Sequence, residues 1–181
     1  MRYYKKIEID YYDEIVANTL SYLQNQKPDI YNKTISASFF VLDLDEFKKY
    51  CPKLDIGFSR YNLVCNFAVA FVMNKTSDVQ IHIDSDKTEA RINIPIINTE
   101  NTFTRFYTGG SYRKHTNSKT NVTAKLLSNI QNLKLVDSVE IIQPTVIRVN
   151  APHNILKNND KFPRITLSLG FDRDPVFLLE D

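Results

Sequence analysis

The sequence predicts a mainly β (α+β) fold, a double-stranded β-helix or jelly roll with N-terminal helices packed outside it. Helical spacing is concentrated in the first part of the chain, roughly residues 1–60. Strand signals dominate the rest, and several of these strands alternate polar with apolar residues. Helices first and strands afterwards are typical of an α+β domain or of a closed β structure with helices outside.

The N-terminal helices are predicted from spacing and from proline. Apolar residues near helical spacing indicate a helix over Tyr11–Leu23, and Pro28 ends any continuation. A second short helix is predicted over Leu44–Tyr50, stopped by Pro52. Both would lie outside a jelly-roll core formed by about residues 61–175.

The core strands are predicted from apolar runs and from alternation. The predicted strands are Leu63–Met73, Val79–Ile83, Ala90–Ile97, Thr102–Tyr107, Val139–Asn150 and Pro163–Phe171. Between them lies a polar insertion at about residues 108–137, which we interpret as a lid or a surface excursion. We predict a helix within it over Val122–Leu133, and a solvated loop for its basic part at 113–119, including His115.

Length and composition limit the classes of function that the chain can have. At 181 residues the chain fits a single domain, 1–181, that buries roughly 70% of its unfolded surface. Its 23 basic and 21 acidic residues nearly cancel, which does not indicate nucleic-acid binding. Neither a membrane span nor an export signal is visible, and Cys51 and Cys65 have no metal-binding spacing. A cytoplasmic protein, of a bacterium or of a phage-infected host cell, is the expectation.

Alternation groups the polar residues of three segments onto shared faces. His82 shares a face with Asp84, Arg91 with Asn93, and Arg164 with Thr166. The simpler interpretation is that each polar face meets solvent in a half-exposed sheet. Solvent faces favour Lys and Glu, however, and these faces carry neither, which indicates a cavity wall.

Two imidazoles and one carboxylate are the ligands of a facial iron(II) site, and His82, Asp84 and His153 supply that set. Arginine is the natural partner of a bound carboxylate, because its planar fork donates two parallel hydrogen bonds. Arg91 and Arg164 are the candidates, with Thr166 adding a hydroxyl. Asn93 and Tyr107 are further candidates for lining the pocket.

This ordered set resembles the signature of the Fe(II)/2-oxoglutarate-dependent dioxygenases: His82-x-Asp84, then His153, then Arg164-x-Thr166. Arg91, nine residues after His82, is similar to an arginine of the aspartyl/asparaginyl β-hydroxylase-like branch. The stretch 91–107 resembles phage and bacterial members of the group. The resemblance covers about residues 79–171. The insertion departs from it, and Asp84 departs from mammalian hydroxylases of that branch, which lack the carboxylate.

The resemblance implies a hydroxylase that uses Fe(II), 2-oxoglutarate and O2 and releases succinate and CO2. His82, Asp84 and His153 would bind the metal and carry catalysis. Arg164 with Thr166 would bind the distal carboxylate of 2-oxoglutarate, and Arg91 the carboxylate next to the metal. Asn93 would complete this cofactor-binding set.

Two other functions stay open on the sequence: a cupin-like metal-binding protein that does not use 2-oxoglutarate, and a non-enzymatic β binding domain. The substrate of an oxygenase would be a peptide side chain, an amino acid or a small metabolite, and fold analogy does not choose among them. The sequence does not indicate an oligomeric state.

Overall fold

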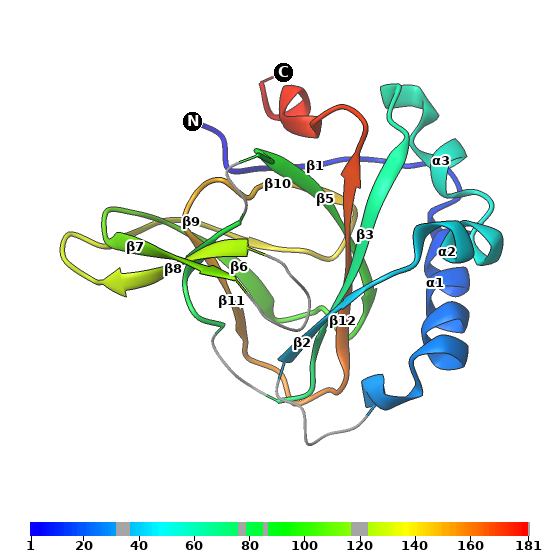
Figure 1. Ribbon diagram of the computed structural model, residues 1–181, viewed down its shortest axis with the longest axis horizontal. Helices are drawn as coiled ribbons and strands as arrows, with labels where there is room; N and C mark the ends of the chain where they lie inside the picture. The colour runs from blue at the N-terminus through cyan, green and yellow to red at the C-terminus, as the bar shows by residue number, and fades with distance from the viewer. Residues whose placement is uncertain (32–36, 76–78, 85–86, 117–122, 181) are drawn as a thin grey trace.

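Two six-stranded antiparallel sheets form the body of the protein (Figure 1). The structure is a computed structural model that describes residues 1–31, 37–75, 79–84, 87–116 and 123–180. Sheet A contains, in spatial order, β1 (Tyr4–Lys6), β10 (Thr145–Arg148), β5 (Ala90–Ile97), β12 (Arg164–Phe171), β3 (Cys65–Met73) and β2 (Ala37–Val41). Sheet B contains β7 (Ser111–Thr116), β8 (Thr123–Asn129), β4 (His82–Ile83), β11 (His153–Lys157), β6 (Thr102–Thr108) and β9 (Lys134–Glu140).

The helices lie against sheet A, on the side away from sheet B (Figure 1). The helical elements are α1 (Tyr12–Gln26), α2 (Leu44–Tyr50) and α3 (Leu54–Gly57), with short 3-10 helices η1 (Pro28–Tyr31), η2 (Ser59–Tyr61) and η3 (Pro175–Leu179). Asp43 starts α2, because its carboxylate accepts a hydrogen bond from the Glu46 backbone N–H at 3.0 Å. Among the described residues, no helix is long and apolar enough to cross a membrane.

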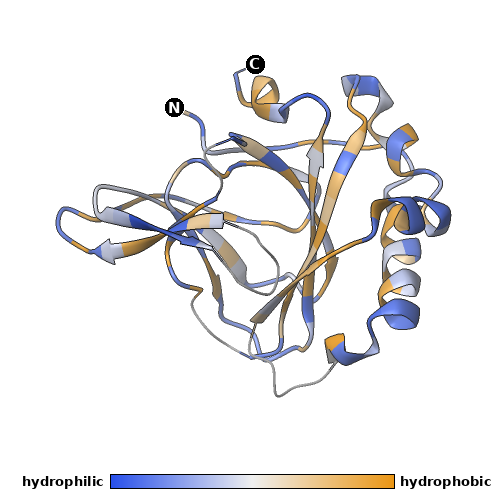
Figure 2. Cartoon of the chain, in the orientation of Figure 1, coloured by the Kyte–Doolittle hydropathy of each residue, from blue (hydrophilic) through white to orange (hydrophobic). Residues whose placement is uncertain are grey.

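The main hydrophobic core lies between α1, α2 and the outer face of sheet A. Alternate residues of β5 and β12 supply the sheet side of this core: Ile92, Ile94, Ile96, Ile165, Leu167 and Leu169. From the helices, Ile15, Leu23 and Phe47 are fully buried against them. Figure 2 shows the resulting apolar strands and helix faces. Burying each such side chain stabilises the fold by about 1.5–3 kcal/mol.

The other face of sheet A points toward sheet B. Phe106 of β6 and Ile147 of β10 belong to one buried cluster, so both side chains lie between the sheets. His153 is the cross-strand partner of Phe106, and Arg91 is the partner of Ile147. Since cross-strand partners point to the same face, His153 and Arg91 also line the space between the sheets.

The structure confirms the predicted jelly-roll class, with mostly antiparallel strands in two sheets and few helices. The predicted helix over residues 44–50 matches α2, and the strand over residues 90–97 matches β5. The predicted elements at 11–23, 63–73, 102–107 and 163–171 correspond to α1, β3, β6 and β12 with ends shifted by one to three residues. Periodicity was sufficient for most of these elements because each has one apolar face, whereas β3 was predicted from its continuous apolar run.

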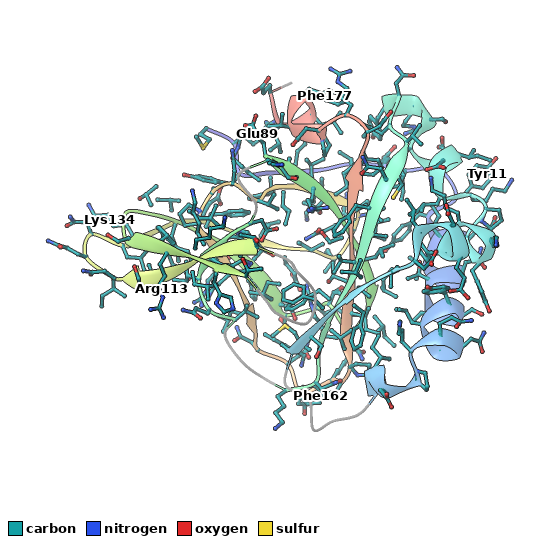
Figure 3. All side chains as sticks on the ribbon, in the orientation of Figure 1. Tyr11, Glu89, Arg113, Lys134, Phe162 and Phe177 are labelled. Atoms are coloured by element: carbon teal, nitrogen blue, oxygen red, sulfur yellow. The ribbon has the colours of Figure 1, made fainter. Side chains whose placement is uncertain are left out.

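The helix predicted over Val122–Leu133 is wrong, because β8 occupies most of that segment. β8 pairs with β7 on one side and β4 on the other, and these ladders override the helix preference of Ala124, Leu126 and Leu127. The insertion therefore extends sheet B with β7, β8 and β9, and its β-strand arm carries Arg113 and Lys134 away from the helices (Figure 3). Residues 117–122, which include part of the predicted basic loop, lie outside the described residues.

Three strand predictions also need correction. The single strand predicted over Val139–Asn150 is divided between β9 and β10, which lie in different sheets. Of the predicted strand Val79–Ile83, only His82 and Ile83 are strand. The N-terminal part, expected to be helical, also contributes the edge strands β1 and β2. Short edge strands carry few alternating residues, so their sequence signal is weak.

Candidate functional site

His82, Asp84 and His153 come together at the junction of β4 and β11. One potential ligand atom from each residue lies within 4.8 Å of the other two. The Nε2 atom of His82 is 3.4 Å from Oδ1 of Asp84, and the two imidazole centroids are 4.4 Å apart. The sequence grouped His82 with Asp84, and the fold adds His153 from a segment about seventy residues later.

Backbone pairing explains this convergence. His82 and His153 are direct cross-strand partners in antiparallel β4 and β11. The Asp84 backbone N–H donates to the Val149 carbonyl at 3.0 Å, which anchors the residue that follows β4. Three side chains are thus placed by main-chain hydrogen bonds, which supply the rigidity that a metal site requires.

Both imidazoles use Nδ1 in the same way. Nδ1 of His82 lies 2.8 Å from the Gln80 carbonyl, and Nδ1 of His153 lies 2.9 Å from the Ala151 carbonyl. A carbonyl only accepts, so each Nδ1 carries a proton and Nε2 is the nitrogen available to a metal, although on protonated His82 it donates to Asp84 instead. This is the outer hydrogen bonding that orients metal-binding histidines. The sequence analysis did not identify these two carbonyls, which lie two residues before each histidine.

The ionisable groups of the site shift one another's pKa values. Burial acts against a charged His82, but the hydrogen bond with Asp84 and its negative charge outweigh it, so the pKa of His82 is raised. Burial also opposes ionisation of Asp84, yet the His82 hydrogen bond and the nearby positive groups hold its pKa below the usual range. Burial and neighbouring His82 lower the pKa of His153 to about 4. A neutral His153 beside an ionised Asp84 is a ready donor set for a cation.

Arg91 lies on the inner face of β5, opposite this cluster. Its guanidinium stacks on Phe67 with 4.5 Å between the carbon Cζ and the ring centroid, and its Nη1 atom is buried without a hydrogen-bond partner. Burial lowers the pKa of Arg91, while the charge of Asp84 opposes that shift. Gly170 provides the space, because a Cβ there would lie 2.6 Å from Nη1.

Arg164, Thr166 and Asn93 are buried on the same inner face, with 1%, 2% and 8% of their surfaces exposed. Nε and Nη1 of Arg164, Oγ1 of Thr166 and Oδ1 of Asn93 are buried and have no hydrogen-bond partner among the residues that the structure describes. Burial lowers the pKa of Arg164 to about 9. The interpretation that these polar faces meet solvent is therefore wrong for Arg164, Thr166 and Asn93.

Unsatisfied buried groups point to a missing partner. Each costs about 1–3 kcal/mol, and native proteins keep few of them. Here they gather on one wall, and the cations among them require an acceptor. A bound carboxylate would satisfy Arg164 and Thr166 together. The donor set of His82, Asp84 and His153 likewise fits iron(II), which is commonly held by two imidazoles and one carboxylate.

Tyr107 does not line this space. Its hydroxyl donates to Oδ1 of Asn154 at 3.1 Å, and Asn154 follows His153 on the opposite face of β11. The prediction for Tyr107 is therefore wrong, because residues alternate along β6 and Phe106 takes the inward position. His115 lies on β7 with its side chain exposed, as predicted, although on a strand and not in a loop.

The sequence analysis missed a further buried cation. Lys157, fully buried on β11, donates from Nζ to the backbone carbonyl and the side-chain oxygen of Asn159. The Nζ atom also lies 3.9 Å from the centroid of the Phe162 ring. Lys157 is four residues after His153, so alternation along the strand places both side chains on the inward face. The sequence pattern therefore contained a signal for the position of Lys157.

A scan against protein-family models and a search of curated proteins give no match for this chain. Solved structures do resemble it. The epimerase SnoN, in complex with Fe3+, alpha ketoglutarate and nogalamycin RO, is 12% identical with a TM-score of 0.59, and the match covers 99% of this chain and 85% of SnoN.

Two further structures are similar. HygX of Streptomyces hygroscopicus is 11% identical with a TM-score of 0.53, over 97% of this chain and 83% of that one. The non-heme monooxygenase ThoJ, solved with nickel, is 10% identical with a TM-score of 0.50, over 93% and 72%. At these identities the likeness shows the fold, a cupin-like jelly roll.

Proposed function

We propose that the protein is an Fe(II)- and 2-oxoglutarate-dependent oxygenase. In this proposal it hydroxylates an unactivated C–H bond of a peptide side chain, an amino acid or a small metabolite and releases succinate and CO2. The resemblance of the sequence to the aspartyl/asparaginyl β-hydroxylase-like branch, and to its phage and bacterial members, is part of the support for this proposal.

The observation that carries the proposal is the combination of two features in one space. The cluster of His82, Asp84 and His153 offers a facial donor set, and the wall opposite carries buried guanidinium groups without acceptors. A metal-binding protein without a co-substrate would have no use for the second feature. A dicarboxylate that also binds the metal accounts for both.

The roles follow from position and charge. His82 and His153 would bind iron through Nε2, since Nδ1 is used by carbonyls, and Asp84 would bind through its carboxylate. Arg164 and Thr166 would hold the distal carboxylate of 2-oxoglutarate. Arg91, whose charge acts on Asp84, would hold the carboxylate next to the metal.

Iron(II) with 2-oxoglutarate and O2 would supply the oxidising chemistry. The chain's own contribution is placement and shielding. Phe106, with its ring centroid 6.3 Å from that of His153, and Tyr3, which stacks on Phe106, would shield one side of the site from water. Asn93, with a free buried Oδ1, would accept a hydrogen bond from a ligand on the same wall.

Similarity of fold adds support without deciding the reaction outcome. SnoN, which binds Fe3+ and alpha ketoglutarate, is an epimerase, whereas ThoJ is a monooxygenase. Different outcomes thus occur on one fold, and function is argued from the site.

The test is turnover of 2-oxoglutarate by purified protein with Fe(II) and O2. We expect succinate and CO2 in equal amounts from the wild type and none from Asp84→Ala. A protein that binds iron yet forms no succinate under these conditions, with or without an extract of small metabolites, would contradict the proposal. Mass spectrometry of the products with 18O2 identifies the acceptor of the oxygen atom.

A further inference from the structure

The edge of sheet A carries two exposed apolar side chains on the same face as the site. Phe39 and Val41 of β2 are 47% and 41% exposed, although they lie in a sheet whose other inner residues are mostly buried. We name this pair the apolar lip. β2 is the last strand of sheet A, so the lip borders the space between the sheets (Figure 1).

Strand register connects the lip to the site. Phe39 pairs with Phe71, and Phe71 pairs with Thr166, so the three side chains form one row across the inner face. Because neighbouring strands are about 4.8 Å apart, Phe39 lies about 10 Å from Thr166 along this row.

A second row runs parallel to the first. Val41 pairs with Val69, Val69 with Ser168, and Ser168 with Asn93. Both rows therefore change from polar at β12 to apolar at β3 and β2. Val69 and Phe71 are 7% and 5% exposed, and the Phe39 ring stacks on that of Phe71 with centroids 4.6 Å apart.

The other face of β2 packs into the core, so the strand has an anchor besides the lip. Phe40, on the opposite face of the strand, packs against the core beneath the helices. Edge strands usually carry charges that prevent association, but the sequence of β2, Ala-Ser-Phe-Phe-Val, has none. Exposed apolar side chains that continue a row of buried polar groups are candidates for binding an apolar group.

We propose that the apolar lip binds the substrate of the proposed oxygenase, and that this substrate carries an aromatic or branched aliphatic group. This inference rests on the proposed function, in which 2-oxoglutarate occupies the part of the inner face that carries Arg91 and Arg164. The inner side chains of β3 and β2 are uncharged, so they offer no partner to a charged group placed on the lip, although Arg164 lies beyond Phe71 with its Cζ 5.7 Å from that ring centroid. An aromatic ring on Phe39 would extend the stack with Phe71.

The test uses small probes of defined chemistry. N-acetyl-phenylalaninamide and N-acetyl-leucinamide represent the apolar class, and N-acetyl-asparaginamide and N-acetyl-lysinamide represent polar ligands of similar size. The chain contains no tryptophan, so Phe39→Trp places a single fluorescent reporter in the lip. Saturation-transfer NMR on the unmodified protein measures the same binding without a substitution.

We expect the two apolar probes to bind, and the polar probes to bind at least tenfold more weakly. Phe39→Asp and Val41→Asp should each weaken binding of the apolar probes tenfold or more. Ile130→Asp is the matched control, because Ile130 is 74% exposed and lies in the β8–β9 turn. It should leave binding unchanged.

Three results would overturn the inference: no binding of either apolar probe, equal binding of the polar probes, or apolar binding that Phe39→Asp and Val41→Asp leave intact. Failure of the proposed function has a separate signature, namely no binding of 2-oxoglutarate to metal-loaded protein. The probe titrations are carried out with and without manganese and 2-oxoglutarate, so the two failures are distinguished.

Discussion

At the centre of sheet A, along β5 and β12, both faces are mostly buried, but their side chains differ in chemistry. On the outer face, Ile94 and Leu167 pack into a continuous apolar core beneath the helices. On the inner face of the same strands, Asn93 and Thr166 keep buried polar atoms without partners. The outer face is a continuous apolar core, whereas the inner face holds polar atoms that a bound ligand would satisfy. Substitutions on the two faces should therefore fail in opposite ways.

The largest effect is expected at His82, Asp84 and His153, the candidate metal ligands on the opposite side of the space between the sheets. Asp84→Ala or His82→Ala should abolish iron-dependent succinate formation and reduce bound metal to background, because two ligands cannot form a facial site. Folding should be retained, since both side chains are partly exposed, 12% for His82 and 33% for Asp84. Metal analysis and circular dichroism measure the two properties. His115→Ala, an exposed histidine on β7, is the control.

Arg164→Met tests the inner face. We expect 2-oxoglutarate binding to weaken by about 2–5 kcal/mol, the cost of losing one partner of a buried charge pair. The ligand-free protein should be as stable as the wild type or more so, because the substitution removes a buried cation that has no acceptor. Calorimetry measures the affinity and urea unfolding the stability. Unchanged affinity would remove Arg164 from the proposed role.

Leu167→Ala tests the outer face, where we expect lower stability and retained affinity for 2-oxoglutarate. Leu167 is fully buried, and its truncation should lower the free energy of unfolding by about 2–5 kcal/mol. Affinity for 2-oxoglutarate should stay within a factor of two or so of wild type, because adjacent residues on a strand point to opposite faces. If Leu167→Ala and Arg164→Met gave the same profile, the division between the faces would be wrong.

The smallest effect is a pH dependence of metal affinity. Metal binding requires neutral imidazoles, so protons compete below the pKa of each histidine. The pKa of His82 is raised and that of His153 is lowered to about 4. As pH falls, metal affinity should therefore begin to drop above the usual histidine pKa, where His82 takes up its proton. Below that point the affinity should fall about tenfold per pH unit, because one proton competes with the metal. Manganese titrations between about pH 5 and 8 measure this dependence. If the pKa of His153 were not lowered, the slope would correspond to two protons instead of one.

Alternation predicted much of the site but not its orientation. The pattern in β5 and β12 separated Arg91 and Asn93 from the isoleucines, and Arg164 and Thr166 from their apolar neighbours. It did not say which face would point inward. The answer depends on the helices, which cover the apolar face and leave the polar face to meet sheet B. Such packing between distant segments is not encoded in a local period.

The incorrect predictions have the same origin. Val122–Leu133 contains good helix formers, but β4 and β7 offer hydrogen bonds on both sides, so β8 forms. Tyr107 was assigned to the pocket from its residue type, whereas its neighbour Phe106 takes the inward position. The convergence of His153 with His82 was expected only by resemblance, since cross-strand pairing over such a separation has no local signal.

The most direct test of the central claim is binding of 2-oxoglutarate to the protein with and without metal. Calorimetry under argon, with manganese in place of iron, avoids turnover. The account predicts one 2-oxoglutarate per chain for the metal-loaded wild type, and much weaker binding when the metal is absent or when His153→Ala removes a ligand. Metal binding without any binding of 2-oxoglutarate would contradict the account and favour a cupin-like metal-binding protein of another function.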